Sequence, residues 1–103
     1  MFSKGYVLTA SEFNGFVVDV LDDAGDYLKE LGEFTIDDFE MYLRDSFESF
    51  LETEGMDMMV VLYGGTVGCS VLEDGIDFVR EVARYYGIKF EELFEDIKKD
   101  IEL

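Results

Sequence analysis

Apolar residues recur at spacings of three and four along two long stretches in the first half of the chain. This spacing is the period of an amphipathic helix, which has one apolar side and one polar side. It predicts a helix over residues 11–31, although Gly25 inside this stretch allows a break. A second helix is predicted over residues 35–54, because Thr35 and Asp38 form a capping box at its start. Each predicted helix is followed directly by a glycine, which is typical of a helix end.

A different pattern follows the second helix. Met58–Tyr63 is a continuous apolar run of strand length, and Gly64-Gly65 after it permits a two-residue turn. Residues 66–71 supply a second strand, so this segment predicts a β-hairpin. Because an isolated hairpin is only marginally stable, the first strand must pack on the helices or pair with another strand. Tyr6–Thr9 is the only other candidate, which makes a three-stranded sheet an option.

The last third of the chain returns to the helical period. A fourth helix is predicted over residues 90–101, after Gly87 has ended the third. An alternative start of the third helix, at Ser70, rests on a capping box formed by Ser70 and Glu73, and the pattern does not decide between this start and a strand. The apolar stripe of the third helix consists of Leu72, Ile76, Val79, Val82, Ala83 and Tyr86.

Together these elements predict an α+β fold that is mostly helical. It has about four helices, with a short β-hairpin or small antiparallel sheet between the second and the third. The 103 residues are expected to form a single acidic domain, 1–103. A domain of this size buries roughly two thirds of the surface that its unfolded chain exposes. With 49% hydrophobic residues, the sequence lies outside the disordered class despite its charge.

Charge sets this sequence apart from an ordinary domain. The 25 acidic residues outnumber the 8 basic ones and give a formal net charge of −17. Because binding to nucleic acids and to anionic membranes depends on cationic side chains, we expect neither as a direct partner. The expected partner is a basic protein. The N-terminal residues lack the pattern of a signal peptide, so we expect the cytoplasm, or the host cell cytoplasm if a phage encodes the protein.

Motifs that carry chemistry are incomplete in this sequence. Cys69 has no histidine to activate it, so we interpret it as a small core residue. The acids of residues 22–33 occupy some ligand positions of an EF-hand loop, but Tyr27 stands where the loop needs glycine. The glycine-rich residues 64–68 lack the lysine of a phosphate-binding loop. We therefore expect no catalytic residues, no metal and no cofactor.

The predicted helices carry acids in stripes on the side opposite their apolar residues. Carboxylates one helical turn apart lie about 5 to 6 Å from each other, a spacing comparable with that of phosphates along a nucleic-acid strand. Like charges at this spacing destabilise a helix, and only Lys29 relieves the first stripe, which indicates a selected surface. The candidate partner-binding residues are Asp19, Asp22, Asp23, Asp26 and Glu30 on the first helix and Asp37, Asp38, Asp45, Glu48 and Glu52 on the second.

In size, charge and display of acids on helices, the chain resembles the small acidic nucleic-acid mimics of phages and mobile elements, the antirestriction and anti-CRISPR inhibitors. The run Val82–Tyr86 is similar to a segment of plasmid-borne antirestriction mimics. The resemblance implies a non-enzymatic inhibitor that blocks the DNA- or RNA-binding groove of a host defence nuclease, such as a CRISPR effector or a restriction enzyme. The alternative is an acidic interaction module, of the immunity, adaptor or antitoxin type, that binds a basic partner without imitating DNA. The sequence leaves open whether two copies form a homodimer through an unpaired strand edge.

A second resemblance covers residues 70–95. Ser70–Gly75 and Val79–Phe94 are similar to the closing half of a phage-repressor helix-turn-helix domain, which implies two helices packed on either side of Gly87. The usual loop after Gly75 is missing, and the preceding residues are glycine-rich and apolar where a repressor has its basic recognition helix. We therefore expect the helix packing of that family without its DNA binding.

Overall fold

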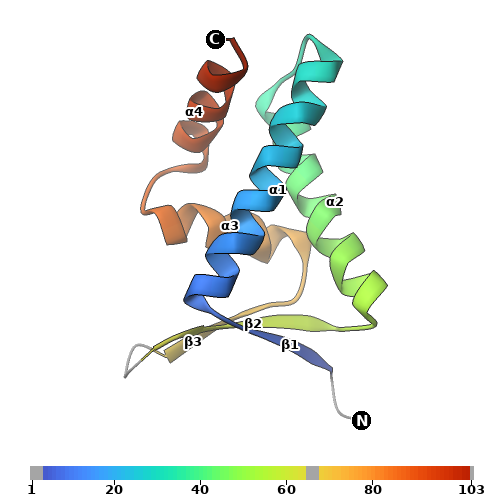
Figure 1. Cartoon of the computed structure of the whole chain (residues 1–103), viewed down its shortest axis with the longest axis vertical. Coiled ribbons are helices and arrows are strands. Elements are labelled where there is room, and N and C mark those ends of the chain that lie inside the picture. The colour runs from blue at the N-terminus through green and yellow to red at the C-terminus, as the bar shows by residue number, and fades with distance from the viewer. Residues whose placement is uncertain (1–3, 65–67, 103) are drawn as a thin grey trace.

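The computed structural model describes residues 4–64 and 68–102. The fold is α+β and mostly helical, as the hydrophobic pattern predicts, with a small sheet at one end of the molecule and the helices rising from it (Figure 1). In chain order the elements are β1 (Gly5–Thr9), α1 (Ala10–Leu31), α2 (Ile36–Glu54), β2 (Met58–Tyr63), β3 (Gly68–Leu72), α3 (Gly75–Tyr86) and α4 (Phe90–Glu102).

The three strands form one sheet in which β2 lies between β1 and β3. β2 and β3 are antiparallel, which confirms the predicted hairpin. β1 joins as the third strand but runs parallel to β2, so the sheet is mixed instead of antiparallel. The connection explains the direction, because α1 leads away from the sheet and α2 leads back to the end where β1 began (Figure 1). Parallel neighbours require a long crossover of this kind.

The two-residue turn predicted at Gly64-Gly65 would pair Tyr63 with residue 66, but the register pairs Tyr63 with Gly68. Residues 65–67 lie outside the described part of the chain. Within the described residues, the strand predicted over residues 66–71 is β3, Gly68–Leu72.

The alternative start of α3 at Ser70 is wrong. Ser70 pairs with Val61 inside the sheet, and pairing with a neighbouring strand outweighs a local capping signal. α3 begins at Gly75 instead, where the side chain of Asp74 accepts a hydrogen bond from the backbone N–H of Asp77 at 2.9 Å. The helix ends before Gly87 as predicted, since this glycine adopts the left-handed conformation, with φ 69°.

α1 is one continuous helix. Its start is fixed by Thr9, which exchanges hydrogen bonds with Glu12 in a capping box. The break allowed at Gly25 does not occur, because the residues before and after this glycine continue the same buried stripe.

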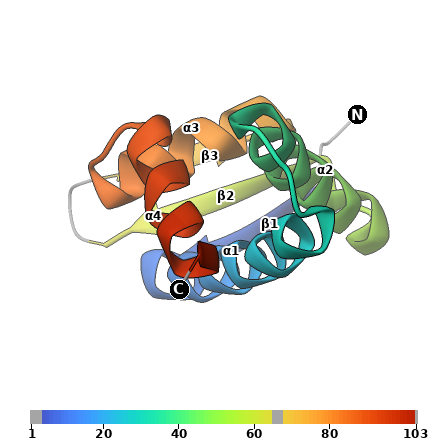
Figure 2. The same ribbon diagram turned by 90° about the horizontal axis from the view of Figure 1, so that it is seen from above.

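All the helices lie on one side of the sheet (Figures 1 and 2), and the core fills the space between them. The strand residues that point toward the helices are buried: Leu8, Met59, Val61 and Leu72. Four fully buried phenylalanines fill the middle of the core: Phe13, Phe39, Phe47 and Phe78.

Cys69 is exposed, so its interpretation as a core residue is wrong. Side chains alternate between the two faces of a strand. Leu72 of β3 points toward the helices and is buried, and Cys69 and Val71 point to the opposite face, which none of the described helices covers.

Candidate partner-binding surface

The ten predicted partner-binding acids lie on α1 and α2, which pack against each other as an antiparallel pair (Figure 1). All of them are exposed except Asp38, which is half-buried. They point away from the core because they alternate with its residues at the helical period, as the sequence pattern predicts. The exposed acids of α1 are Asp19, Asp22, Asp23, Asp26 and Glu30, and those of α2 are Asp37, Asp45, Glu48 and Glu52.

Two of these acids also serve the fold. The Asp38 carboxylate accepts a hydrogen bond from the backbone N–H of Thr35 at 2.8 Å, which confirms the pairing predicted at the start of α2. The Glu48 carboxylate accepts a long hydrogen bond, 3.4 Å, from the backbone N–H of Gly75 at the start of α3. Changes at these positions therefore disturb helix ends as well as surface charge.

An open hollow of about 420 Å³ lies on the surface of the α1–α2 pair. Tyr27 of α1 stacks on Tyr42 of α2, with ring centroids 4.8 Å apart and an angle of 26° between the planes. Two predicted acids, Asp38 and Asp45, stand beside this aromatic pair. We call this feature the tyrosine hollow; its lining consists of Tyr27, Asp38, Met41, Tyr42, Asp45, Ser46 and Ser49.

The tyrosine hollow has the chemistry of a site for an organic cation. An arginine guanidinium stacks on aromatic faces and pairs with carboxylates through its planar set of donors. Met41, whose side chain is 51% exposed, adds an adaptable apolar wall for the methylene stem of such a side chain. Charge periodicity alone does not reveal this site, because the aromatic pair joins residues from two helices.

Two of the α1 acids belong to a different hollow. Asp22 and Asp26 line a space of about 220 Å³ between α1 and α4, together with Asp100 of α4 and the one basic residue of α1, Lys29. The acids of the two predicted stripes therefore do not line one common hollow. Asp38 and Asp45 gather around the tyrosines, and Asp22 and Asp26 gather with an acid from α4.

The acidic surface is hardly neutralised within the molecule. In the part of the chain that the structure describes, one ion pair is found, between Arg84 and Glu81 at 2.8 Å, and neither residue belongs to the predicted surface. The candidate acids of α1 and α2 consequently keep their charge available for a partner.

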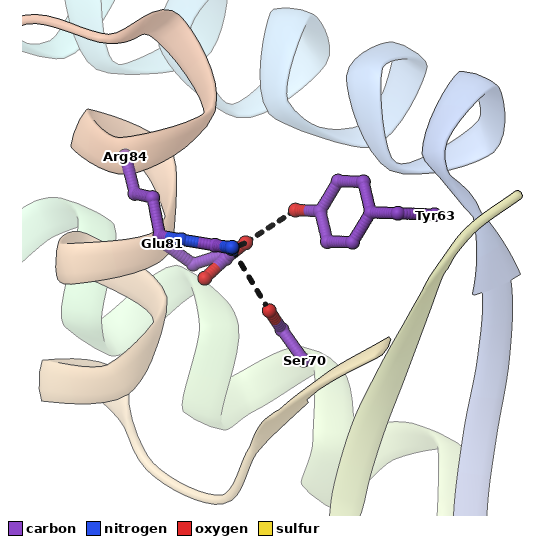
Figure 3. A network of polar contacts seen from close by, with 4 residues as sticks. All are labelled: Tyr63, Ser70, Glu81 and Arg84. Carbon is purple, nitrogen blue, oxygen red and sulfur yellow. Dashed lines mark hydrogen bonds and ion pairs between the residues drawn. The ribbon is translucent and has the colours of Figure 1, made fainter. Parts of the chain in front are cut away.

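A polar network that the sequence pattern did not reveal ties α3 to the sheet (Figure 3). The Tyr63 hydroxyl of β2 donates a hydrogen bond to the Glu81 carboxylate, which is buried on α3. Arg84 donates to the same carboxylate oxygen at 2.8 Å and to the Ser70 hydroxyl of β3 at 3.1 Å. A signal existed in the sequence, because Glu81 stands three residues after Phe78 and so on the apolar side of its helix.

This network is suited to holding the fold together. Burial, and then the hydrogen bond to Glu81, raise the pKa of Tyr63 above its ordinary value of 10.0, so its phenol is a neutral donor at physiological pH. The Arg84 guanidinium lies 5.6 Å from the centre of the Tyr63 ring, which adds a cation–π contact. The two charged groups of the network, Glu81 and Arg84, are paired with each other, and a buried carboxylate such as Glu81 requires a partner of this kind.

Comparison of the chain with protein-family models, with curated proteins and with solved structures finds no match. Among the described helices, none combines the length and the apolar character that crossing a membrane requires.

Proposed function

We propose that the protein is a non-enzymatic inhibitor that mimics nucleic-acid charge and blocks the DNA- or RNA-binding groove of a host defence nuclease, a CRISPR effector or a restriction enzyme. The observation that carries this proposal is the exposed, unneutralised acidic surface of α1 and α2. A groove that holds phosphates presents Lys and Arg. Carboxylates about 5 to 6 Å apart along a helix meet such cations with complementary charge, which accelerates association.

The tyrosine hollow adds a specific contact to this general attraction. We expect an arginine that normally holds a phosphate to stack on the Tyr27–Tyr42 pair and to pair with the carboxylate of Asp45, which lines the same hollow. The expected complex therefore combines a broad acidic field with one stacked arginine.

A second candidate is an acidic interaction module that binds a basic partner without imitating DNA. The observation that favours it is that Asp38 and Asp45 line one hollow, which is partly aromatic, whereas Asp22 and Asp26 line another. A partner of this module would be recognised mainly by the shape and aromatic surface of the tyrosine hollow.

Two triple variants of equal charge separate a specific acidic surface from net charge. The test variant carries Asp22→Asn, Asp26→Asn and Glu30→Gln, and the control carries Glu91→Gln, Glu95→Gln and Glu102→Gln. Each removes three carboxylates from exposed helical positions and keeps side-chain shape. Binding to a panel of purified CRISPR effectors and restriction enzymes, with and without their nucleic acid, is measured by competition.

Charge mimicry predicts that the protein and the nucleic acid exclude each other from at least one nuclease. It also predicts that the test variant binds that nuclease about ten-fold more weakly, while the control changes binding much less. Equal weakening by both variants would show that only net charge matters.

A further variant, Tyr27→Ala, removes an aromatic wall and no charge. If it abolishes binding to a basic partner that the test triple leaves unchanged, the second candidate function replaces the first. Circular dichroism and urea unfolding of each variant check that its fold is intact.

A further inference from the structure

The central strand has the composition of a strand that is covered on both faces. Its residues, Met58–Tyr63, form an uninterrupted apolar run. The hydroxyl of Tyr63 is its one polar side-chain group. A strand with one wet face alternates between apolar and polar residues, and continuous runs are typical of strands buried on both sides. The helices cover only one face of this sheet, where Met59 and Val61 are fully buried (Figures 1 and 2).

The other face of the sheet is open and apolar. The register places Val7, Val60 and Val71 side by side in one row across the three strands, and Leu62 beside Cys69 in the next. Val7 is 56% exposed, Leu62 43% and Val71 46%. We call this feature the open sheet face; it consists of Gly5, Val7, Thr9, Met58, Val60, Leu62, Cys69 and Val71.

The open sheet face carries no charged residue, although 32% of the chain is charged. A basic groove would gain nothing from this surface, so it is not part of the acidic surface proposed to enter a nuclease. The occupant that fits it is another neutral, apolar surface.

We propose that the open sheet face is the contact between two copies of this chain, packed sheet against sheet. A second copy offers the same uncharged surface, and a two-fold axis makes such a face self-complementary. This inference goes beyond the proposed function and stands independently of it.

Charge favours this arrangement over other contacts between copies. Each copy has a net charge of −17, so contacts between helical surfaces bring acids together. Sheet-to-sheet packing leaves the helices of both copies on the outer sides of the two sheets, so the acids of the helices stay farther apart than the about 10 Å between packed sheets. That distance exceeds the Debye length of about 8 Å at physiological ionic strength, so the repulsion is largely screened.

The size of the face sets the strength of the dimer. Strands of five or six residues, at about 3.3 Å per residue, and three strands about 4.8 Å apart give a contact of roughly 17 by 14 Å. This is well below the area of about 800 Å² per partner in a standard stable interface. A weak dimer is therefore expected, with a Kd of about 10 μM or higher.

Sedimentation equilibrium of the full chain in a reducing buffer tests this proposal. The reducing agent prevents a disulfide between Cys69 residues from being mistaken for the dimer. Over protein concentrations from about 10 μM to about 1 mM, the dimer is expected to form and to tighten as NaCl is added, because salt screens the repulsion between copies. A monomer at every concentration and salt would overturn the proposal and leave the face to an unlike partner.

Two matched variants assign the contact to a surface. Val71→Lys places a cation on the open sheet face, and Val18→Lys makes the same exchange on α1, where Val18 is 41% exposed. Both reduce the net negative charge equally, so a dimer held by a surface that contains neither residue responds to both alike. We expect Val71→Lys to raise the dimer Kd about ten-fold or more and Val18→Lys to leave it unchanged or lower.

A more conservative variant, Val71→Thr, distinguishes a weakened dimer from a protein that no longer folds. Val71→Thr keeps a β-branched side chain suited to a strand, and it is expected to weaken the dimer less than Val71→Lys does. Amide NMR spectra recorded across the same concentrations should shift at the residues of the open sheet face. Shifts confined to the helices, or equal effects of the Lys variants, would contradict the proposal.

Discussion

The carboxylate of Glu81 is held by donors from two different parts of the chain. Tyr63 reaches it from the central strand, and Arg84 reaches it from the next turn of its own helix (Figure 3). A buried carboxylate that loses one donor keeps its desolvation cost without full compensation. The network therefore contributes to stability through the pairing of both donors, and its contribution depends on the protonation of Tyr63.

Stability is expected to fall at alkaline pH because of Tyr63. Its pKa is raised in the folded protein, so above pH 10.0 the unfolded chain releases a proton that the folded chain retains. The unfolded state then binds fewer protons, and the free energy of unfolding decreases as pH rises. Tyr63→Phe removes this titration, so its unfolding free energy should depend less on pH above about pH 10.

Urea unfolding of both proteins from about pH 7 to about pH 11 measures this effect. Near pH 7 the variant should be less stable by about 1 to 3 kcal/mol, because Glu81 has lost a donor. The difference should shrink as pH rises. Some alkaline loss should persist in the variant, because burial raises the pKa of Tyr86 as well. Parallel stability curves for the two proteins would contradict the role assigned to Tyr63.

Single residues show where a sequence pattern stops being informative. Cys69 was placed in the core because small apolar residues are usually buried, but its position depends on which face of β3 the helices cover. The sequence pattern predicts no role for Glu81, yet it is buried and accepts hydrogen bonds from Tyr63 and Arg84. In both cases the environment comes from segments distant in the chain.

At the scale of elements, α3 packs closely against α2 at Gly75, the first residue of α3. A Cβ atom added there would lie 2.7 Å from the Cβ and 2.8 Å from the Cα of Arg44 on α2. Atoms of a helix backbone cannot easily move aside, so only glycine allows α3 to start at this distance from α2. The φ angle of Gly75 is not positive, so its backbone conformation does not require glycine. The requirement comes from the close approach of Arg44 alone.

Gly75→Ala is therefore expected to destabilise the protein by about 1 to 3 kcal/mol through overpacking. Gly15→Ala is the matched control, since Gly15 lies within α1 and a Cβ there meets nothing within 4 Å. It should stabilise the protein by about 0.5 to 1 kcal/mol, as alanine is the better helix former. Urea unfolding compares the two variants, and a Gly75→Ala protein as stable as the wild type would show that α2 and α3 are less tightly packed than described.

The elements that the sequence predicted well are those specified by local signals. The helical period, the pairing of Thr35 with Asp38 and the glycine after each of the first three helices place both ends of α1, α2 and α4 to within a residue or two. The end of α3 is also predicted, but its predicted stripe begins at Leu72, which lies in β3, three residues before the helix starts. Pairing between strands depends on the path of the chain between them, and the antiparallel option failed for β1 because α1 and α2 form a crossover. The stripe assigned to α3 omitted Phe78, which is fully buried, and included Ile76, which is 42% exposed.

At the scale of the whole molecule, the exposure of the acids was predictable and their grouping was not. Helical periodicity identifies the side of each helix that faces water. It does not fix how α1 rotates against α2 and α4. That rotation brings Tyr27 beside Asp38 and Asp45, and Asp22 beside Asp100. The tyrosine hollow is therefore a product of packing between helices.

The net charge of −17 predicts that salt stabilises the folded protein. Folding concentrates the acids, and the ion pair between Glu81 and Arg84 is the one that the structure shows within residues 4–64 and 68–102. Counterions screen the remaining repulsion, so the melting temperature should rise by several degrees between about 10 mM and about 0.3 M NaCl. In a domain of this size, a change of about 1 kcal/mol in the free energy of unfolding shifts the melting temperature by about 4 to 8 °C. Melts at low micromolar protein keep dimer formation from contributing. The variant with Asp22→Asn, Asp26→Asn and Glu30→Gln carries fewer charges and loses four repulsive pairs at spacings of three or four residues along α1. It should therefore melt higher at low salt and respond less to NaCl. A melting temperature that is flat or falls with added NaCl would mean that the acids are compensated within the fold.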